Sequence, residues 1–364
     1  MHGYVFIVFL KIDSYRYINI MYVFLLLLLL LLTFISGYTI YKRRVEGNKK
    51  LWQQSIALII SQAIFFTDEE DDRVDITYRI EMLLQNSMFR NCVINELIQA
   101  KKNLSGSSTL NLKKLYEILE LDKDSFKKLN NIKAHIKAKG IQELAMMEQI
   151  KYLKPIFRLT NNENELVRNE AQCALVCFYG FLGLRFLNVT AYPISQWQQI
   201  QLLNKLNEVK PENFNVIKKW LQSSNESVVV FSLKLATFYN CYDVYNNIIT
   251  CLQSLSLPIK LNALEYLKKM PKDDTAEQII SHYTFENKIY KLAIIDALKE
   301  IGNENQISFL LKRLHDKDDD VKAAAAKCLS CLHPSGSAFL QTHLFADENP
   351  WKAIFLQIKS ERAA

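Results

Sequence analysis

The chain has 364 residues, 49% of them hydrophobic and 23% charged, so its apolar content suffices for a folded core and excludes wholesale disorder. Its 9 Gly and 7 Pro are too few for the turns of a β-sandwich or barrel and argue against the glycine-rich loop of a Rossmann fold. The net charge of +7 suits an anionic partner, but residues 1–50 hold 7 basic and 2 acidic residues, whereas the rest hold 38 and 36. The positive charge is therefore concentrated near the N-terminus.

Residues 20–41 form an uncharged run of 22 residues with eight consecutive leucines at 25–32. As a helix, this run is long enough to cross a hydrocarbon core of about 30 Å. A cleaved secretory signal is the alternative, but the run exceeds the usual apolar length of about 7–15 residues and no Ala-x-Ala site follows it. We predict an uncleaved transmembrane helix at 20–41 after a flank at 1–19. Met21 is an alternative start, which would leave residues 1–20 untranslated.

The basic residues beside this run are unevenly distributed. Lys11 and Arg16 precede it, and five follow it: Lys42, Arg43, Arg44, Lys49 and Lys50. By the positive-inside rule, the C-terminal side lies in the cytoplasm. Seven cysteines, several inside apolar helical patterns, agree with free thiols in a reducing compartment. The sequence predicts a single-pass protein of the cytoplasmic (inner) membrane with a cytoplasmic C-terminal domain.

Two helical segments are predicted to follow the span. Residues 42–109 comprise a basic collar and a helical connector, in which an apolar face at 52–64 can continue the membrane helix. Residues 110–160 are predicted to form an N-terminal cap of the next domain, because capping units are atypical in sequence. Five lysines of this segment lie close together and form a candidate interaction patch for an anionic lipid, a nucleotide or an acidic partner: Lys127, Lys128, Lys133, Lys137 and Lys139. A solvated helix face is the commoner interpretation of such a run and the one we favour.

One helical pattern recurs over residues 161–361. Each copy begins with an apolar residue at position zero, and in most copies a basic residue follows at position one. Small or apolar residues occupy position three or four and positions seven and eight. An apolar residue occupies position eleven. The copies begin at Val167, Val229, Ile259, Tyr290, Val321 and Trp351, with spacings of 62, 30, 31, 31 and 30 residues. Since 62 is two periods, the unit after Val167 is diverged or enlarged.

A second apolar helix is predicted between copies, at 214–221, 244–252, 276–283 and 307–314. Each period is then a helical hairpin that cannot bury its apolar face alone, so stacking predicts an all-α fold with a right-handed α-solenoid. The bases at position one are expected to pair with acids of the preceding turn, such as Asp318–Asp320, rather than to form a basic ladder: Arg168, Lys260, Lys291 and Lys322.

The frame Val-Arg/Lys-x-x-Ala-x-x-Ala-Leu-x-x-Ile-Gly resembles short HEAT-like repeats of the phycobilisome-lyase type, over about residues 140–361 and most strongly over 255–332. Its period is shorter than the roughly 40–47 residues of standard HEAT and armadillo repeats. The layout resembles bacterial membrane-anchored HEAT proteins, some of which are encoded beside envelope-polysaccharide glycosyltransferases. That resemblance implies, as one alternative, an accessory subunit of such a membrane enzyme.

Catalytic motifs are missing from the sequence. None of the six histidines is followed by Glu, so the His-Glu pairs that hold iron in HEAT-like deoxyhypusine hydroxylases are not present. There is no phosphate loop and no Gly-x-Ser-x-Gly elbow. We interpret the pairs Cys328/Cys331 and Cys173/Cys177 as small residues of repeat helices rather than redox or metal pairs. We expect no enzyme activity, cofactor, metal site or small-molecule substrate.

The remaining hypotheses concern binding. The leading one is a membrane-anchored cytoplasmic scaffold or adaptor that binds a protein partner through the solenoid, with the bilayer contacted through residues 20–41. A nucleic-acid-binding HEAT-like module is the rival from another class. Residues 161–364 carry 22 basic and 22 acidic residues, which argues against the positive field that such a module needs.

Overall fold

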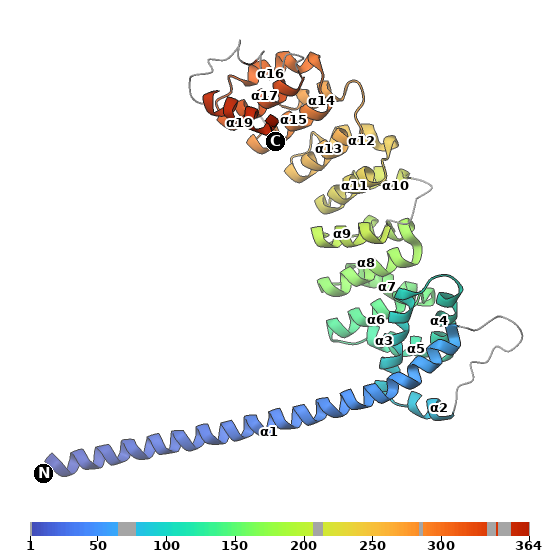
Figure 1. Cartoon of the computed structure of the whole chain (residues 1–364), viewed down its shortest axis with the longest axis vertical. Helices are drawn as coiled ribbons and strands as arrows, with labels where there is room; N and C mark the ends of the chain where they lie inside the picture. Colours follow the sequence, from blue (N-terminus) through green and yellow to red (C-terminus); the bar gives the residue numbers. More distant parts are fainter. Residues whose placement is uncertain are drawn as a thin grey trace, which may run out of the picture. The chain divides into compact units, whose positions relative to one another are not determined.

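A computed structural model describes residues 2–64, 78–206, 214–283, 287–332, 340 and 351–363, and within these ranges all regular structure is helical. The chain divides into two compact units, Met1–Lys127 and Lys128–Ala364, labelled along the chain in Figure 1. The helices of the first unit are α1 (His2–Ile64), α2 (Tyr78–Leu84), α3 (Ser87–Asn103), α4 (Ser107–Ile118) and most of α5 (Leu121–Leu129).

Helix α1 carries the predicted apolar run on its surface. Its stretch Ile18–Arg44 has 27 residues, a mean hydropathy of 2.8 and a most apolar window that is 0% buried. The leucines at 25–32 are between 41% and 61% exposed. This stretch is long and apolar enough to cross a membrane, and a signal sequence near an N-terminus has the same properties. A second stretch of suitable length, Glu165–Asn188, is 61% buried, as expected for a core segment of a soluble domain.

The last part of α1 packs inside the first unit. Ile56, Ile59 and Ala63 are 1–2% exposed, on a helix that packs against α3 and α4. The Trp52 ring meets the Phe89 ring edge-on, with centroids 5.6 Å apart. The predicted apolar face at 52–64 is confirmed, and it lies on the same continuous helix as the exposed stretch.

The second unit is built from paired helices. Its longer helices are α6 (Ala134–Met146), α8 (Glu165–Tyr179), α9 (Gln196–Leu206), α11 (Glu226–Phe238), α13 (Leu257–Lys269), α15 (Lys288–Ile301), α17 (Asp319–Leu332) and α19 (Trp351–Ala363). Its shorter elements are η1 (Ile150–Tyr152), α7 (Leu153–Arg158), η2 (Leu159–Asn161), η3 (Gly180–Asn188), α10 (Asn215–Trp220), η4 (Tyr242–Val244), α12 (Tyr245–Cys251), α14 (Thr275–Ser281), η5 (Glu304–Gln306) and α16 (Ile307–Arg313).

These helices stack in sequence order. Helices α11, α13, α15 and α17 each pack against the next, and each also packs against the short helix that precedes it, α10, α12, α14 or α16 (Figure 1). Three of the four short helices fall within the segments predicted for them, and α14 begins at Thr275, one residue before its predicted segment 276–283. The prediction of an all-α repeat solenoid is thus confirmed for the described residues.

The turn before each long helix is the same in most copies. A capping side chain three residues before position zero accepts a hydrogen bond from the position-zero N–H: Asn164 from Val167 (3.3 Å), Ser195 from Gln198 (3.3 Å), Ser256 from Ile259 (3.4 Å) and Asn287 from Tyr290 (2.9 Å). Such caps satisfy N–H groups that have no partner within the helix. In several copies the side chain two residues before the cap accepts a hydrogen bond from the backbone N–H of the capping residue: Asn162, Ser223, Ser254 and Asp316.

This turn identifies the copy of the repeat that lies between the copies at Val167 and Val229. Helix α9 has its cap at Ser195 and position zero at Gln198, 31 residues after Val167. Gln198 is buried, and its Nε2 donates to the Asn169 carbonyl over 3.1 Å. The unit after Val167 is therefore diverged in sequence rather than enlarged. In the following copy the cap is Asn225, which places the register at Val228, one residue before Val229.

Helix α6 adds a copy inside the predicted cap segment 110–160. The Lys133 N–H donates to Asn131 Oδ1 over 2.9 Å, which is the same turn as at Asn162, 31 residues earlier. Position zero is then Ile136, and position eight is Leu144, which is fully buried. The domain limits at 42–109, 110–160 and 161–361 stay predictions.

The remaining frame residues are placed as follows. Val167, Val229, Ile259, Tyr290 and Val321 are buried, and Trp351 is half-buried. Lys322 pairs over 2.7 Å with Asp319, one of the acids expected as its partner, which is the first residue of the same helix, α17. Other position-one bases use different partners: Arg168 donates to the Asn162 carbonyl over 2.7 Å, and the ammonium groups of Lys260 and Lys291 lie 4.9 Å and 5.5 Å from the Tyr290 and Tyr283 ring centroids.

Candidate interaction site

An apolar groove of about 380 Å³ opens on the surface of the second unit, between α7, α8 and η3. Its lining residues are Leu153, Phe157, Leu175, Tyr179, Leu182, Gly183 and Arg185. We call this the α7–η3 groove. It lies in the diverged unit, where a 3-10 segment stands in place of the second helix of the hairpin.

A close backbone contact shapes the groove. A Cβ atom at Gly183 would lie 2.2 Å from the carbonyl oxygen of Leu175, so only glycine lets η3 lie directly on α8. Leu175 is 3% exposed and forms part of the floor. The neighbouring residue Leu182 is exposed and lines the groove.

The walls of the groove expose large apolar side chains. Phe157 is 42% exposed, Tyr179 44% and Leu182 56%. Apolar side chains scattered singly over a surface are ordinary, whereas a cluster around a concavity is typical of a binding site. Tyr179 and Arg185 are of the residue types that often dominate the binding energy of protein interfaces.

Three basic side chains belong to the elements that line the groove. Arg185 is one of the lining residues, and Lys154 and Arg158 each follow a lining residue of α7 by one position, about 100° further around the helix. All three are exposed. Within the described part of the chain, none of them forms an ion pair. The site therefore combines an apolar floor with unneutralised positive charge.

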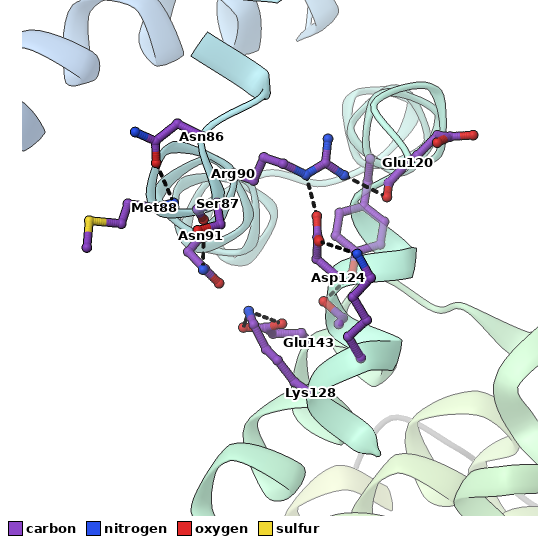
Figure 2. A network of polar contacts seen from close by, with 12 residues as sticks. Asn86, Ser87, Met88, Arg90, Asn91, Glu120, Asp124, Lys128 and Glu143 are labelled. Atoms are coloured by element: carbon purple, nitrogen blue, oxygen red, sulfur yellow. Dashed lines mark hydrogen bonds and ion pairs between the residues drawn. The ribbon is translucent and has the colours of Figure 1, made fainter. Parts of the chain in front are cut away.

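The five lysines of the predicted patch do not form one free cationic surface. Lys128 Nζ binds both carboxylate oxygens of the buried Glu143, each over 2.7 Å (Figure 2), and Lys139 lies 3.8 Å from the same carboxylate. Lys127 belongs to the first unit and lies 3.8 Å from Asp124. Lys133 is exposed and Lys137 half-buried at the start of α6. Thus Lys128 has a structural role in the second unit.

Figure 2 also shows the contact that ties α3 to α5 in the first unit. The Arg90 guanidinium pairs with Asp124 and donates to the Glu120 carbonyl over 2.9 Å. Among the membrane-flanking bases, Lys42, Arg43 and Arg44 are exposed on α1. The side chains of Lys49 and Lys50 lie outside the described residues.

The cysteines lie apart from the groove. Residues 173 and 177 stand on the side of α8 that faces α9, roughly opposite residues 175 and 179 that line the groove. The Lys205 ammonium donates to Cys177 Sγ over 3.3 Å, and burial raises the pKa of Cys173 to about 11. All seven cysteines are free thiols. Across the described ranges, His, Cys, Asp and Glu form no group of three that could hold a metal ion.

Sequence reasoning did not find the α7–η3 groove. The available signal was the segment 180–187, where two glycines interrupt an apolar run in place of the expected second helix. The 62-residue gap between recognised copies marked the same segment as diverged, but a gap in a pattern does not say that the surface is hollow.

One comparison with known proteins supports the repeat architecture, a match to a family model. The family model for HEAT repeats matches residues 246–330. Among solved structures, human deoxyhypusine hydroxylase in complex with glycerol is 11% identical, with 86% of this chain and 97% of that chain covered and a TM-score of 0.28. The complex of CpcE and CpcF of phycocyanin lyase from Nostoc sp. PCC7120 is 11% identical, covering 81% and 98%, with a TM-score of 0.24.

A structure of tubulin recruitment by microtubule polymerases with TOG domain arrays is 10% identical, covering 86% of this chain and 91% of that chain, with a TM-score of 0.28. No curated protein matches the sequence. The architecture rests on the family match and on the stacked hairpins rather than on these low superposition scores. Residues 246–330 therefore carry HEAT repeats, the family whose model they match.

Proposed function

We propose that this protein is a membrane-anchored scaffold whose HEAT repeats hold a protein partner at the cytoplasmic face of the membrane. The α7–η3 groove carries the proposal, because it presents exposed aromatic and leucine side chains on a rigid stack of helices. HEAT repeats are a protein-binding type of scaffold. The right-handed sense of the solenoid belongs to the same proposal.

The exposed stretch Ile18–Arg44 supports the membrane anchor. Its leucines would be costly to leave in water over such a length, and the exposed bases at 42–44 suit the cytoplasmic headgroup region. We propose that the stretch is retained as a span rather than removed as a signal.

The protein acts, in this proposal, by binding and not by catalysis. A named client, such as a membrane glycosyltransferase, is a special case in which the scaffold serves as an accessory subunit. Nucleic-acid binding is the less favoured alternative, since the repeats are neutral overall.

Crosslinking in intact cells tests the proposal. The full chain with a C-terminal tag is crosslinked, extracted from membranes and purified, and its partners are compared with those of a groove variant, Leu182→Asp. The expected result is a reproducible membrane-associated protein that the wild-type chain captures and the variant loses.

The matched control is Leu255→Asp, because Leu255 is fully exposed outside the groove and its change should leave capture intact. Absence of any reproducible protein partner would contradict the scaffold function. Equal capture by both variants would leave a scaffold whose binding face is not the groove.

A further inference from the structure

We infer that the α7–η3 groove takes an acidic amphipathic helix, with apolar side chains in the groove and Asp or Glu against Arg185 and the exposed bases of α7, Lys154 and Arg158. This inference rests on the proposed function and names the chemistry of the partner. The proposed occupant is a protein segment and not a lipid.

The size of the groove sets the apolar part of the ligand. A volume of about 380 Å³ accommodates a few large side chains but not a folded domain. Side chains at i and i+3 or i+4 of a helix project from one face and are the usual anchors of a helix that binds in a groove. Phe157, Tyr179 and Leu182 supply exposed apolar contacts for such anchors.

The charge around the groove sets the polar part. Lys154 and Arg158 lie on α7, and Arg185 lies on η3, so the bases come from two elements that both border the groove. No ion pair within the described residues neutralises them. A ligand with carboxylates flanking its apolar face would pair with these bases, and guanidinium groups bind carboxylates in a geometry that favours two parallel hydrogen bonds.

The composition of the border favours a peptide over a lipid. Arginine and tyrosine are enriched where proteins bind proteins, and both can donate hydrogen bonds to a peptide backbone or carboxylate. The Tyr179 side chain, 44% exposed, stands beside Leu182 in the lining, so apolar and hydrogen-bonding contacts occur together.

Fluorescence anisotropy with two synthetic helical peptides tests the inference. Both carry Leu and Phe at i and i+4; one has Glu at the flanking positions and the other has Lys. The full chain is held in nanodiscs of zwitterionic lipid, and empty nanodiscs serve as the blank. We expect saturable binding of the Glu peptide and binding of the Lys peptide at least about tenfold weaker, a difference of about 1.4 kcal/mol.

A charge exchange separates recognition from a merely structural effect. In the double variant Arg158→Glu/Arg185→Glu, the preference should reverse, so that the Lys peptide binds more tightly than the Glu peptide. Leu182→Asp should weaken both peptides, whereas Leu255→Asp and Lys312→Glu, which change exposed residues outside the groove, should leave Glu-peptide binding unchanged.

Three results would overturn the inference: equal binding of the two peptides, no reversal in the double variant, or displacement of the Glu peptide by phosphatidylglycerol vesicles that bind through Arg158 and Arg185. Each leaves the scaffold function standing if crosslinking still captures a partner. Conversely, peptide binding with no captured partner would contradict the scaffold function alone.

Discussion

Glu143 is a buried carboxylate at a position where other copies of the repeat have small side chains. It occupies position seven of the α6 copy, which is filled by Ala174, Ala297 and Cys328 elsewhere. Its side chain is 3% exposed and that of Lys128 is 15% exposed. A buried charge is tolerated only when a partner compensates it. The Lys128 ammonium group supplies that compensation for the Glu143 carboxylate.

Removal of one partner should therefore be costly. We expect Lys128→Ala to lower the free energy of unfolding by about 3 kcal/mol, because it removes both 2.7 Å contacts of the buried Glu143 carboxylate and leaves Lys139 at 3.8 Å. Lys127→Ala is the control, since that side chain is 80% exposed, and its effect should stay within about 0.5 kcal/mol. Urea denaturation followed by circular dichroism measures both, and equal effects would show that the pair has no such role.

The cysteines differ in accessibility by position within the repeat. Cys177 and Cys331 are exposed, whereas Cys173 and Cys328 are buried. Burial raises the pKa of the Cys173 thiol to about 11 and of the Cys328 thiol to about 12. The thiolate is the reactive form of cysteine, and the thiols of Cys173 and Cys328 are almost entirely protonated near neutral pH.

Alkylation of the folded protein should follow this order. At pH 8 we expect iodoacetamide to modify Cys177 and Cys331 well before Cys173 and Cys328, as read by peptide mass spectrometry. The buried thiols should gain reactivity only as the pH rises toward their pKa values or when urea unfolds the chain. Rapid modification of Cys328 at pH 8 in the native state would contradict the packing of α17.

At the scale of the element, the turn before each long helix sets the register of the stack. A side chain at the cap and another two residues earlier fix the backbone where one hairpin joins the next. The apolar position zero follows the cap by three residues in these copies. Register is thus encoded in the turn as well as in the apolar face.

Asn287 provides the test of this coupling, because its Oδ1 accepts from the Tyr290 N–H over 2.9 Å. Asn287→Ala should lower the free energy of unfolding by about 1 kcal/mol, whereas Asn287→Ser keeps a capping oxygen and should recover most of that loss. Thermal and urea denaturation of the three proteins measure the difference. An alanine variant as stable as the serine variant would show that the cap is dispensable.

At the scale of the whole molecule, the two units differ in what they present to solvent. The first carries an exposed apolar helix, and the second carries a neutral repeat array with the apolar α7–η3 groove, which Arg185 lines in part. The proposed function assigns the first to the membrane and the second to the partner.

The anchor should resist extraction. We expect the full chain, with tags at both termini, to remain intact in the membrane pellet after alkaline carbonate washing. Leu27→Arg/Leu31→Arg should shift it toward the supernatant, since each arginine near the centre of a span costs about 2.5–3.5 kcal/mol. Leu27→Ala/Leu31→Ala is the matched control. Loss of the N-terminal tag from the mature protein would instead identify a cleaved signal.

The sequence predicted those features that are carried by local periodicity. The apolar run of α1 and the frames at Val167, Ile259, Tyr290 and Val321 are visible because the same kinds of residue recur at fixed spacing. The copy at Gln198 was not recognised, because a buried amide replaces the apolar residue, and its Nε2 donates to the Asn169 carbonyl 29 residues away. The copy in α6 was missed for a related reason, since its buried Glu143 depends on Lys128 in another helix.

The groove could not be predicted from the sequence, for a different reason. Its shape depends on how closely η3 approaches α8 at Gly183, and that distance is a property of packing and not of spacing in the sequence. The charge of Arg185 was counted with other basic residues, while its place in the lining of the groove could be assigned only once η3 was placed.

The continuity of α1 has a geometric consequence in the proposed membrane setting. Residues 45–51 join the exposed stretch to the packed end as uninterrupted helix, so they fix both the height of the first unit above the bilayer, about 10 Å, and its azimuth around the helix axis. Inserting one residue there would swing that unit by about 100°, whereas inserting seven would restore the azimuth to within about 20° and add about 10 Å of height. The membrane would thus set the direction in which the first unit faces as well as its distance from the surface.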